Sequence, residues 1–325
     1  MMIDEGAGIR RPRLAQAPPR VRLAVREMLG GPVVAEQAAD AGFTPSIASV
    51  VTGGDGRRLF VKAAPVGDGL GEAVTAGVVL AGVTGPVGPR LVGCASAGRW
   101  RVAAYEVVDG TAVTCWRAAD LPHLLRVVDR LRKIAQPCPV VGVTPYAEAF
   151  VPLLGTWRAL NGEGDGGVAV DHLRGRPLPV ELPIPLLAGL EGDWLDALAA
   201  GTALHHGDLR RDNVIREPGG RLRIVDWTHL WTAPGWLDLV RLGPDLAICG
   251  HDPERMLRRS CWRDAPADAV DVALAGLAGR AWREGWLPPV PGLPGLRRMQ
   301  RRQGLHLLRW LAARRRRTLP PPLAQ

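Results

Sequence analysis

The segment 204–239 carries the pattern that most narrows what this chain can fold into. Asp208 and Asn213 stand at the two ends of one short loop, and the turn 218–220 leads into a second apolar run that ends at Asp226. Because a hairpin returns the chain beside its start, Asp226 is expected to lie next to Asn213. The pattern therefore predicts a polar site built from a loop, a hairpin and the turn that follows the hairpin.

These three side chains suit phosphoryl transfer. Carboxylate and amide oxygens are the ligands that Mg²⁺ prefers, so Asn213 and Asp226 are candidate metal ligands. Asp208 is a separate carboxylate that can orient a hydroxyl group and accept its proton. Transfer of a phosphoryl group from a nucleotide requires this division of roles.

The segment resembles the catalytic core of the aminoglycoside phosphotransferase family, relatives of the protein kinases. That family's pattern is His-Gly-Asp-Leu-x-x-x-Asn, then an apolar strand ending in Asp-Trp, then a Gly and an Asp-Leu pair. The counterparts in this chain are His206-Gly207-Asp208-Leu209, Asn213, Asp226-Trp227, Gly235 and Asp238-Leu239. The resemblance covers about residues 36–247.

The resemblance implies an α+β, bilobal protein-kinase-like fold, and the hydrophobic pattern is consistent with it. The first lobe reads as a small antiparallel sheet with one helix, and the second lobe as larger and mainly helical. In the first lobe the expected strands are 47–51, 58–63, 89–94 and 100–108, with the helix at 70–82. In the second lobe one helix is expected to begin at Asp120. Further helices are expected at 194–200, 236–247, 265–285 and 296–316.

Three divisions of the chain follow from this pattern. Residues 1–20 are rich in Pro and Arg and are expected to form a loose N-terminal tail. Residues 21–108, beginning with a helix at 21–30, form the expected nucleotide-binding lobe. Residues 109–325 form the expected catalytic and substrate-binding lobe.

The resemblance also implies residues that hold the nucleotide. Lys62 ends a strand-like run and is one of two lysines in the chain; it is expected to bind the α- and β-phosphates, with Glu72 as its partner. No GxGxxG loop precedes it; Ser46 in the segment 42–48 is a candidate loop residue for the phosphates, or else the segment is a plain turn. Backbone groups near Glu106 and Val108 are expected to bind the adenine.

The remaining roles concern the catalytic loop. His206 is expected to order the loop by hydrogen bonding to backbone, and Asp238 to bind backbone N–H groups of the same loop. Arg210 is a candidate for stabilising charge during transfer, or else a solvated arginine. His205 is expected to be incidental.

The expected activity is transfer of the γ-phosphoryl group of ATP or GTP, with Mg²⁺, to a hydroxyl of a small molecule. An aminoglycoside would need an acidic pocket, whereas a nucleoside, a macrolide-like compound, an amino alcohol or a peptide antibiotic is equally possible. The resemblance suggests a role in antibiotic resistance or in biosynthesis. Candidate acids for such a pocket are Glu191, Asp193, Asp196, Asp245, Asp252, Glu254, Asp264, Asp268 and Asp271. Eleven Trp residues also stand in the chain; some are expected to pack in the core, and one or two are candidates to stack on a ring-bearing or apolar substrate.

Two functions other than phosphotransfer stay open. The first is a catalytically silent, kinase-like regulator that binds a nucleotide. The formal net charge is +9, and nine arginines without an acid lie in 297–317. The second is a nucleic-acid-associated protein that binds through this arginine-rich helix, although no nucleic-acid-binding motif accompanies the helix.

The cellular compartment is predicted from absences in the sequence. The five cysteines include no CxxC pair, which disfavours a disulfide framework or a zinc cluster. The first 20 residues lack a signal-peptide core, and no apolar run reaches the roughly 18 residues needed to cross a bilayer. We therefore expect a cytoplasmic protein that does not enter the membrane, and the oligomeric state is left open.

Overall fold

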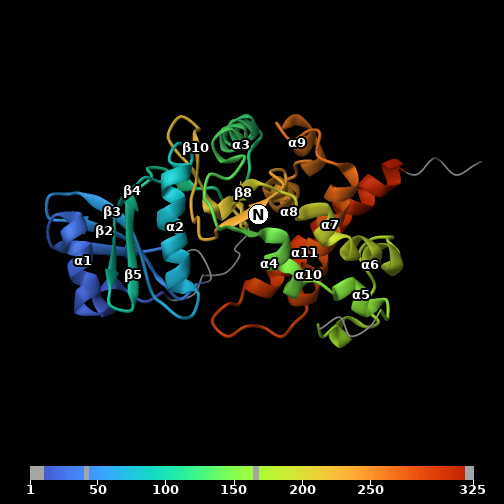
Figure 1. Cartoon of the computed structure of the whole chain (residues 1–325), viewed down its shortest axis with the longest axis horizontal. Coiled ribbons are helices and arrows are strands. Elements are labelled where there is room, and N and C mark those ends of the chain that lie inside the picture. The colour runs from blue at the N-terminus through green and yellow to red at the C-terminus, as the bar shows by residue number, and fades with distance from the viewer. Residues whose placement is uncertain (1–10, 40–43, 164–167, 319–325) are drawn as a thin grey trace, which may run out of the picture.

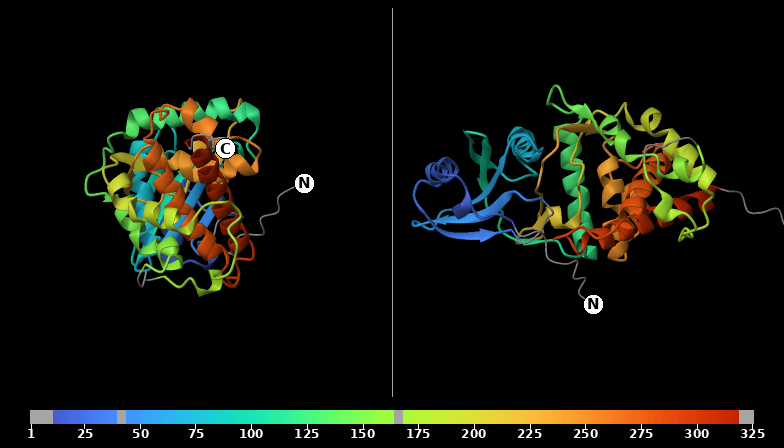
Figure 2. Two further views of the ribbon diagram at one scale, coloured as in Figure 1. Left: turned by 90° about the vertical axis from the view of Figure 1, so that its right-hand side faces the viewer. Right: turned by 90° about the horizontal axis from the view of Figure 1, so that it is seen from below.

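The computed structural model describes residues 11–39, 44–163 and 168–318. Over these residues the chain forms two lobes, one built on a β-sheet and the other on helices (Figure 1). The view from below shows the same division, with the blue to teal strands at one end and the red helices toward the other (Figure 2). The predicted α+β, bilobal kinase-like architecture is confirmed.

The first lobe is a five-stranded antiparallel sheet with the order β1-β2-β3-β5-β4. Its strands are β1 (Val33–Ala38), β2 (Ile47–Gly53), β3 (Arg58–Pro65), β4 (Leu91–Ala97) and β5 (Trp100–Glu106). Four of the strands match the predicted runs, and the turn between β2 and β3 contains Gly56 in a left-handed conformation. The edge strand β1 was not predicted, because its sequence VVAEQA is short and two of its six residues are polar.

A helix covers each face of this sheet. Helix α1 (Pro19–Leu29) packs one face against Val61 and other alternate residues of the strands. Helix α2 (Leu70–Thr84) packs the opposite face with Ala64 and Tyr105. Since side chains alternate along a strand, Lys62 falls on the α2 face of β3. Lys62 is thereby directed toward the side of the sheet where the second lobe begins.

The expected loose tail is wrong for residues 11–20. A 3-10 helix at Leu14–Gln16 precedes α1, and both Leu14 and Ala17 are buried in the core between α1 and the sheet. The apolar positions of this short segment are too few to show a periodicity, so its burial could not be read from sequence. Residues 1–10 lie outside the described part of the chain.

The second lobe is mainly helical. Its helices are α3 (Leu121–Ala135), α4 (Tyr146–Phe150), α5 (Thr156–Leu160), α6 (Ile184–Gly192), α7 (Trp194–Leu198), α8 (Leu237–Ile248), α9 (Pro253–Arg259), α10 (Ala267–Gly285) and α11 (Leu296–Thr318). The helices predicted from periodicity are all present, and α4, α5, α6 and α9 are additional. Helix α10 is the centre of this lobe, since most of its residues are buried against α6, α7, α8 and α11.

Tryptophans and glycines bring these helices close together. Trp157 donates from its indole N–H to the Ala275 carbonyl of α10 at 2.8 Å, and Trp194 donates to the Ala147 carbonyl at 2.9 Å. A side chain at Gly276 would lie 2.5 Å from the Trp194 ring. Buried indoles that satisfy their own N–H explain much of the tryptophan content as core packing.

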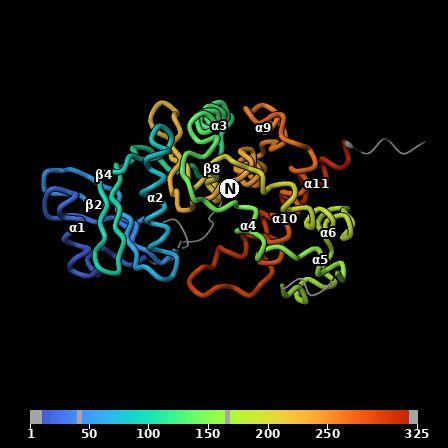
Figure 3. Tube along the Cα trace, in the orientation of Figure 1, coloured from blue at the N-terminus to red at the C-terminus, as the bar shows by residue number. Residues whose placement is uncertain are grey.

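Short strands surround the predicted catalytic loop. One sheet has the order β10-β9-β6 and the other β7-β11-β8. The strands are β6 (Thr111–Ala112), β7 (Thr144–Pro145), β8 (Ala203–His205), β9 (Val214–Arg216), β10 (Leu222–Ile224) and β11 (Trp231–Ala233). The predicted hairpin β9–β10 is confirmed, and in the Cα trace it lies where the two lobes meet (Figure 3). The Ile224 N–H donates to the Val87 carbonyl just beyond α2, which ties the hairpin to the first lobe.

The predicted boundary at residue 108 falls in the segment that joins β5 to β6, and β6 already pairs with β9 of the second lobe. In the described part of the chain, no helix is both long enough and apolar enough to cross a membrane.

Candidate active site

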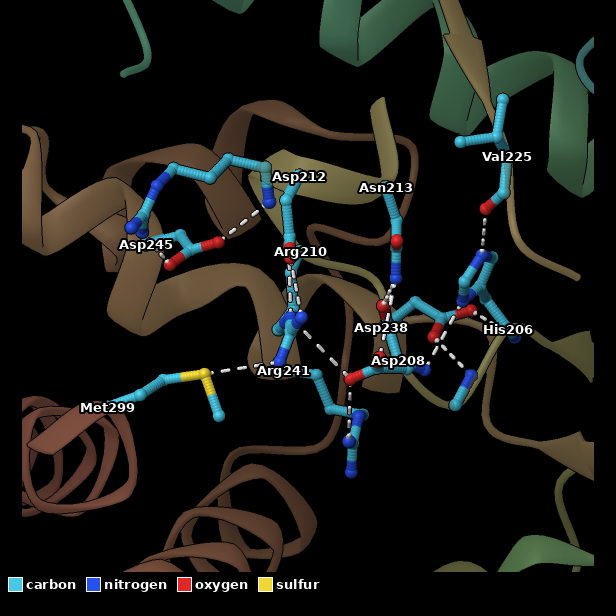
Figure 4. Close-up of polar contacts among 12 residues, drawn as sticks. His206, Asp208, Arg210, Asp212, Asn213, Val225, Asp238, Arg241, Asp245 and Met299 are labelled. Carbon is cyan, nitrogen blue, oxygen red and sulfur yellow. Dashed lines mark hydrogen bonds and ion pairs between the residues drawn. The ribbon is translucent and has the colours of Figure 1, made fainter. Parts of the chain in front are cut away.

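The loop after β8 is held by one buried carboxylate. Asp238, in the first turn of α8, accepts hydrogen bonds from the backbone N–H groups of His206 at 2.9 Å and Gly207 at 3.2 Å. The ring of His205 contacts the same carboxylate through Nδ1 at 3.0 Å. The predicted role of Asp238 therefore agrees with these contacts (Figure 4). The expectation that His205 is incidental is wrong, because its ring contacts the Asp238 carboxylate.

These contacts explain two shifts in pKa. Burial by itself raises the pKa of the Asp238 carboxyl, but His205 and the N–H groups of the loop hold it well below its usual range. Burial lowers the pKa of His205, and Asp238 only partly opposes this. His205 is therefore a neutral donor at pH 7, and Asp238 is an anion whose charge is used to hold the loop.

His206 holds the loop from the other side. Its ring Nε2 lies 3.0 Å from the carbonyl oxygen of Val225, the residue before Asp226. Its Nδ1 accepts a hydrogen bond from the Asp208 N–H at 3.2 Å. One imidazole thus links the loop that bears Asp208 to the turn that bears Asp226, as the sequence predicted for a residue that orders the loop.

A second buried pair anchors the far end of the loop. Asp245 of α8 accepts from the Arg211 backbone N–H at 2.7 Å and from its guanidinium at 2.5 Å. Both side chains are about nine-tenths buried. Asp245 therefore supports the loop and does not belong to an acidic substrate pocket.

The structure brings together the three polar residues on which the sequence analysis rests. The Asn213 amide donates to the Asp208 carbonyl at 2.9 Å and to the Asp208 carboxylate at 3.3 Å. The Val225 N–H donates to the Asn213 carbonyl at 2.9 Å, which places Asp226 beside Asn213. Asp226 has φ of 65°, the one positive φ of a non-glycine residue in the described ranges. Such a backbone conformation is uncommon outside glycine and concentrates at functional sites.

Lys62 reaches across from the first lobe to Asp226, and the two side chains form an ion pair. Burial by itself raises the pKa of the Asp226 carboxyl, but the Lys62 ammonium, with His206 and Arg11, lowers it to about 2. The carboxylate is thus ionised at every physiological pH. A cationic amine and an ionised carboxylate meet at the point where phosphates and a cation would be placed.

The donor set at this point fits Mg²⁺. An amide oxygen of Asn213 and a carboxylate of Asp226 are hard ligands, and Mg²⁺ is usually bound by one or two such groups together with phosphates and waters. Within the described ranges, no cluster of three or more His, Cys, Asp or Glu residues could hold a metal by itself. The residues present therefore suit a metal that arrives with a nucleotide.

Glu72 does not take the place that the sequence predicted. It is an exposed residue in the first turn of α2, and its carboxylate accepts from the Gly67 N–H at 3.2 Å. The partner of Lys62 in this structure is Asp226. The expectation of a Lys62–Glu72 pair is therefore wrong for this structure, because the carboxylate instead binds the loop before its own helix.

The loop between β1 and β2 carries a contact that sequence reasoning missed. Arg11 donates from one guanidinium nitrogen to the Thr44 carbonyl at 2.9 Å and to the Ser46 carbonyl at 3.3 Å. The charge of Arg11 also acts on Asp226. Ser46 stands directly before β2, at the end of this loop, and residues 42 and 43 of the predicted segment 42–48 lie outside the described residues. An arginine from the N-terminal segment thus joins the candidate phosphate loop.

The segment after β5 is the predicted adenine-binding connection. The side chain of Glu106 is bound by the Arg90 N–H at 3.0 Å and by the Arg223 guanidinium at 2.6 Å. Burial opposes ionisation of Glu106, but these donors lower the pKa of the carboxyl below its ordinary value. Val108 follows in a stretch without strand pairing. The side chain of Glu106 is thus used within the protein, and its backbone N–H donates to the Arg90 carbonyl at 2.9 Å. The adenine-binding role of the backbone near Glu106 and Val108 stays a prediction.

Arg210 is not a solvated arginine. Its guanidinium forms two hydrogen bonds with Asp212, at 3.0 and 2.6 Å, and lies 3.8 Å from the Asp208 carboxylate. A third contact runs to the Met299 sulfur at 3.2 Å. Burial opposes the charge of Arg210, but Asp208 and Asp212 raise its pKa above the ordinary value. Arg210 is held as a fixed cation beside Asp208.

A cavity of about 210 Å³ opens beside Asp208. Its lining residues are Phe150, Asp208, Arg210, Arg241, Pro244, Leu277, Arg280, Ala281, Glu284, Leu296, Met299, Gln300, Gln303 and Leu307. Sequence reasoning missed Arg241 and Arg280, since an arginine on a helix of an arginine-rich chain carries no distinguishing signal. The lining includes one aromatic residue, Phe150, and no tryptophan, so the expected stacking on tryptophan finds no support in this cavity.

His229 is a further residue near Asp208 that the sequence did not single out. Its ring stacks on Trp231, with centroids 3.9 Å apart and planes 6° apart. Burial lowers the pKa of His229 to about 4, so the ring is neutral at pH 7.

The acids named as candidates for an aminoglycoside pocket do not line this cavity among the described residues. Glu191 caps the start of α5, Asp252 caps α9, and both Glu254 and Asp271 bind Arg314. None of the candidate acids named from the sequence lines the cavity beside Asp208.

No family model and no curated protein matches this sequence. Solved structures do match. A thermostable mutant of aminoglycoside phosphotransferase APH(4)-Ia, in a ternary complex with ADP and hygromycin B, is 13% identical, with a TM-score of 0.58 over 89% of this chain and 98% of that one. An aminoglycoside phosphotransferase from Alicyclobacillus acidocaldarius is 16% identical, with a TM-score of 0.57 over 93% and 97%.

A choline kinase from Streptococcus pneumoniae is 13% identical, with a TM-score of 0.51 over 88% of this chain and 97% of that one. The chain therefore has the kinase-like fold shared by these small-molecule phosphotransferases, over nearly their whole length. The low identity leaves the substrate undefined.

Proposed function

We propose that this protein is a small-molecule phosphotransferase that moves the γ-phosphoryl group of a nucleotide to a hydroxyl group. The observation that carries the proposal is the meeting of Lys62 from the first lobe with Asp226 from the second, beside Asn213 and Asp208. A polar site that needs both lobes is suited to a ligand bound between them. The fold is similar to that of an aminoglycoside phosphotransferase solved with ADP and to that of a choline kinase, and this similarity supports the same assignment.

In this proposal, Asp208 binds the acceptor hydroxyl and accepts its proton as the oxygen attacks the γ-phosphorus. A new P–O bond forms, the bond to the β,γ-bridging oxygen breaks, and the nucleoside diphosphate leaves. Lys62 binds the α- and β-phosphates, and Arg210, fixed by Asp212, stabilises charge that develops next to Asp208. The loop contacts of His206 and Asp238 keep these groups in place before the substrates arrive.

Asn213 and Asp226 are the residues that would hold Mg²⁺. The cation would neutralise phosphate charge and orient the transferred group. Residues 44–46, with Ser46 and Arg11, would cover the phosphates, and backbone groups of Glu106 and Val108 would bind the base. The choice between ATP and GTP stays open, as does the oligomeric state. The same proposal divides the chain at residue 108 into a nucleotide-binding lobe and a catalytic lobe. It also places the protein in the cytoplasm.

Thermal unfolding in the presence of nucleotides tests the proposed site. ATP and GTP are each added with and without Mg²⁺ to the wild-type protein, to Asp226→Asn and to the control Asp196→Asn, which changes an exposed acid of α7. We expect stabilisation by a nucleotide that requires Mg²⁺, that persists in Asp196→Asn and that is lost in Asp226→Asn. Absence of stabilisation by either nucleotide would contradict the proposal.

A silent nucleotide-binding regulator is the first alternative. The candidate set of Lys62, Asp208, Asn213 and Asp226 is present with its supporting contacts, which favours an enzyme. Binding of Mg²⁺ and nucleotide without transfer to any hydroxyl compound would restore the alternative.

A nucleic-acid-associated role for α11 is the second alternative, and the contacts of α11 disfavour it. Arg314 binds Glu254 and Asp271, and Arg315 lies 2.9 Å from Asp271. Arg301 stacks on the Trp286 ring at 5.0 Å. Much of the basic charge of this helix is therefore used in packing it against the lobe. Salt-dependent binding of DNA or RNA, lost on Arg316→Gln and Arg317→Gln, is the result that would favour the alternative.

A further inference from the structure

The cavity beside Asp208 differs in charge from what a polycationic acceptor needs. Three arginines, Arg210, Arg241 and Arg280, line it, against two acids, Asp208 and Glu284. Glu284 is already bound, since it accepts from Arg280 at 2.9 Å and from Gln300 at 2.6 Å. A cationic substrate would thus meet guanidinium groups and find no unoccupied carboxylate except the proposed base.

Among the three arginines that line the cavity, Arg241 has the positive charge that is least neutralised by acidic partners. Its guanidinium donates to the neutral Tyr146 hydroxyl at 2.6 Å and lies 3.9 Å from the Asp208 carboxylate, beyond hydrogen-bonding distance. Its Nε is buried and has no hydrogen-bond partner in the described part of the chain. Arg210 differs, because Asp212 binds it through two hydrogen bonds.

The surroundings hold Arg241 in position. It stands on α8 three residues after Asp238, the anchor of the catalytic loop, and its guanidinium lies 5.6 Å from the centre of the Tyr146 ring. Its side chain is 17% exposed. A rigid, mostly buried guanidinium with unused hydrogen-bonding capacity is a binding group for an oxyanion, which it can contact through two nitrogens.

We propose that the acceptor substrate is a small hydroxyl compound that also carries an oxyanion group, a carboxylate or a phosphate ester. Arg241 binds the oxyanion, and Arg280 neutralises Glu284, which would otherwise repel an anion in the cavity. Arg241 thereby places the hydroxyl at Asp208, next to which it stands (Figure 4). This inference rests on the proposed phosphotransferase function and narrows its substrate class away from aminoglycosides.

Anion binding to the protein saturated with Mg²⁺ and ADP tests the assignment, because the nucleotide site is then filled. Acetate and methyl phosphate are titrated at constant ionic strength, with thermal unfolding as the measurement. We expect one or both to stabilise the wild-type protein, and the stronger of the two identifies the oxyanion. In Arg241→Gln the affinity should fall about 10- to 100-fold, whereas Arg263→Gln, which changes an arginine whose side chain is 73% exposed, should leave it unchanged.

Arg280→Gln serves as a second variant where Arg241→Gln fails to fold, and it should weaken binding to a smaller degree. Stabilisation that is absent in the wild type, or that is equal in the wild type and in the folded arginine variants, overturns the proposal. An acceptor panel completes the test, with each hydroxyl compound supplied as its carboxylate, its neutral amide and its amine. Phosphorylation of the amines in preference to the carboxylates would also overturn it.

The two proposals fail in different ways. If Mg²⁺–ADP stabilises the protein but the anions do not, the proposed substrate class is refuted and the phosphotransferase proposal stands. Absence of any nucleotide effect, with acetate or methyl phosphate still binding in an Arg241-dependent manner, removes the phosphotransferase and leaves an anion-binding cavity.

Discussion

Replacing Asp238 with Asn removes the charge that holds the catalytic loop while keeping the shape of the side chain. Three donors, the N–H groups of His206 and Gly207 and the Nδ1 of His205, point at this carboxylate within 2.9–3.2 Å. Hydrogen bonds to a charged group contribute about 1.5–3 kcal/mol each, and they do not add fully. Asn keeps one acceptor oxygen and turns an NH₂ group toward a donor. We expect Asp238→Asn to lower the free energy of unfolding by about 3–5 kcal/mol, the range for breaking a buried pair.

Chemical denaturation and thermal unfolding measure this loss. At roughly 2–4 °C per kcal/mol for domains of 150–250 residues, the unfolding temperature should fall by about 6–20 °C. Asp196→Asn, which changes an exposed acid, should stay within about 1 °C of the wild type. Because the pKa of Asp238 is held well below its usual range, its contribution is present above about pH 4 and is lost as the pH falls below that value. A change of less than 1 kcal/mol in Asp238→Asn would refute the reasoning that this carboxylate anchors the loop.

Three further predictions concern the nucleotide site and the groups near it. Lys62→Met should raise the KM for the nucleotide about 10-fold or more, whereas Glu72→Gln should change it less than about threefold, because Glu72 binds the Gly67 N–H. Arg11→Gln should raise the same KM with little change in kcat, because Arg11 binds the loop at Thr44 and Ser46. His229→Gln should reduce the loss of stability between pH 6.5 and pH 4. The pKa of about 4 leaves native His229 neutral there while the unfolded chain takes up a proton.

The Lys62 and Arg11 predictions each have a matched control variant. Lys133→Met changes the other lysine of the chain, which is exposed on α3, and should leave the nucleotide KM unchanged. Arg13→Gln changes an exposed arginine two residues from Arg11. For the pH dependence, thermal unfolding of the wild type and His229→Gln is compared at several pH values. Equal KM values in Lys62→Met and Lys133→Met, or identical pH profiles with and without His229, would contradict the corresponding assignment.

Local patterns explain why much of the fold could be predicted. The glycine-rich turn 53–56 and the alternating runs beside it define the β2–β3 hairpin, and the 3.6-residue periodicity of 121–134 defines α3. The motif in 204–239 likewise constrains Asp208, Asn213 and Asp226, because a loop, a hairpin and a turn act over short distances in sequence. Elements with a weak local pattern were missed. The edge strand β1 is short and partly polar, and the buried Leu14 packs with strand residues that lie far along the chain.

The same distinction applies to the candidate site. The position of Asp226 follows from a hairpin of a dozen residues, whereas its pairing with Lys62 spans 164 positions and becomes visible only in the structure. Glu72 shows the opposite error, since the identity of a residue at a helix start does not reveal which donor it faces. Arg241 gave no signal in a chain with so many arginines. Its significance comes from the neutral Tyr146 hydroxyl and the Asp208 carboxylate beside it.

Direct detection of phosphoryl transfer tests the central claim. The wild-type protein, Asp208→Asn and the control Asp196→Asn are incubated with Mg²⁺, γ-labelled ATP or GTP, and hydroxyl compounds that bear carboxylate, phosphate, neutral or amine groups. The account predicts a labelled, phosphorylated acceptor with the wild type and the control, and a rate at least about 100-fold lower with Asp208→Asn. Transfer at equal rates with and without the Asp208 carboxylate, or nucleotide binding without transfer to any acceptor, would contradict it.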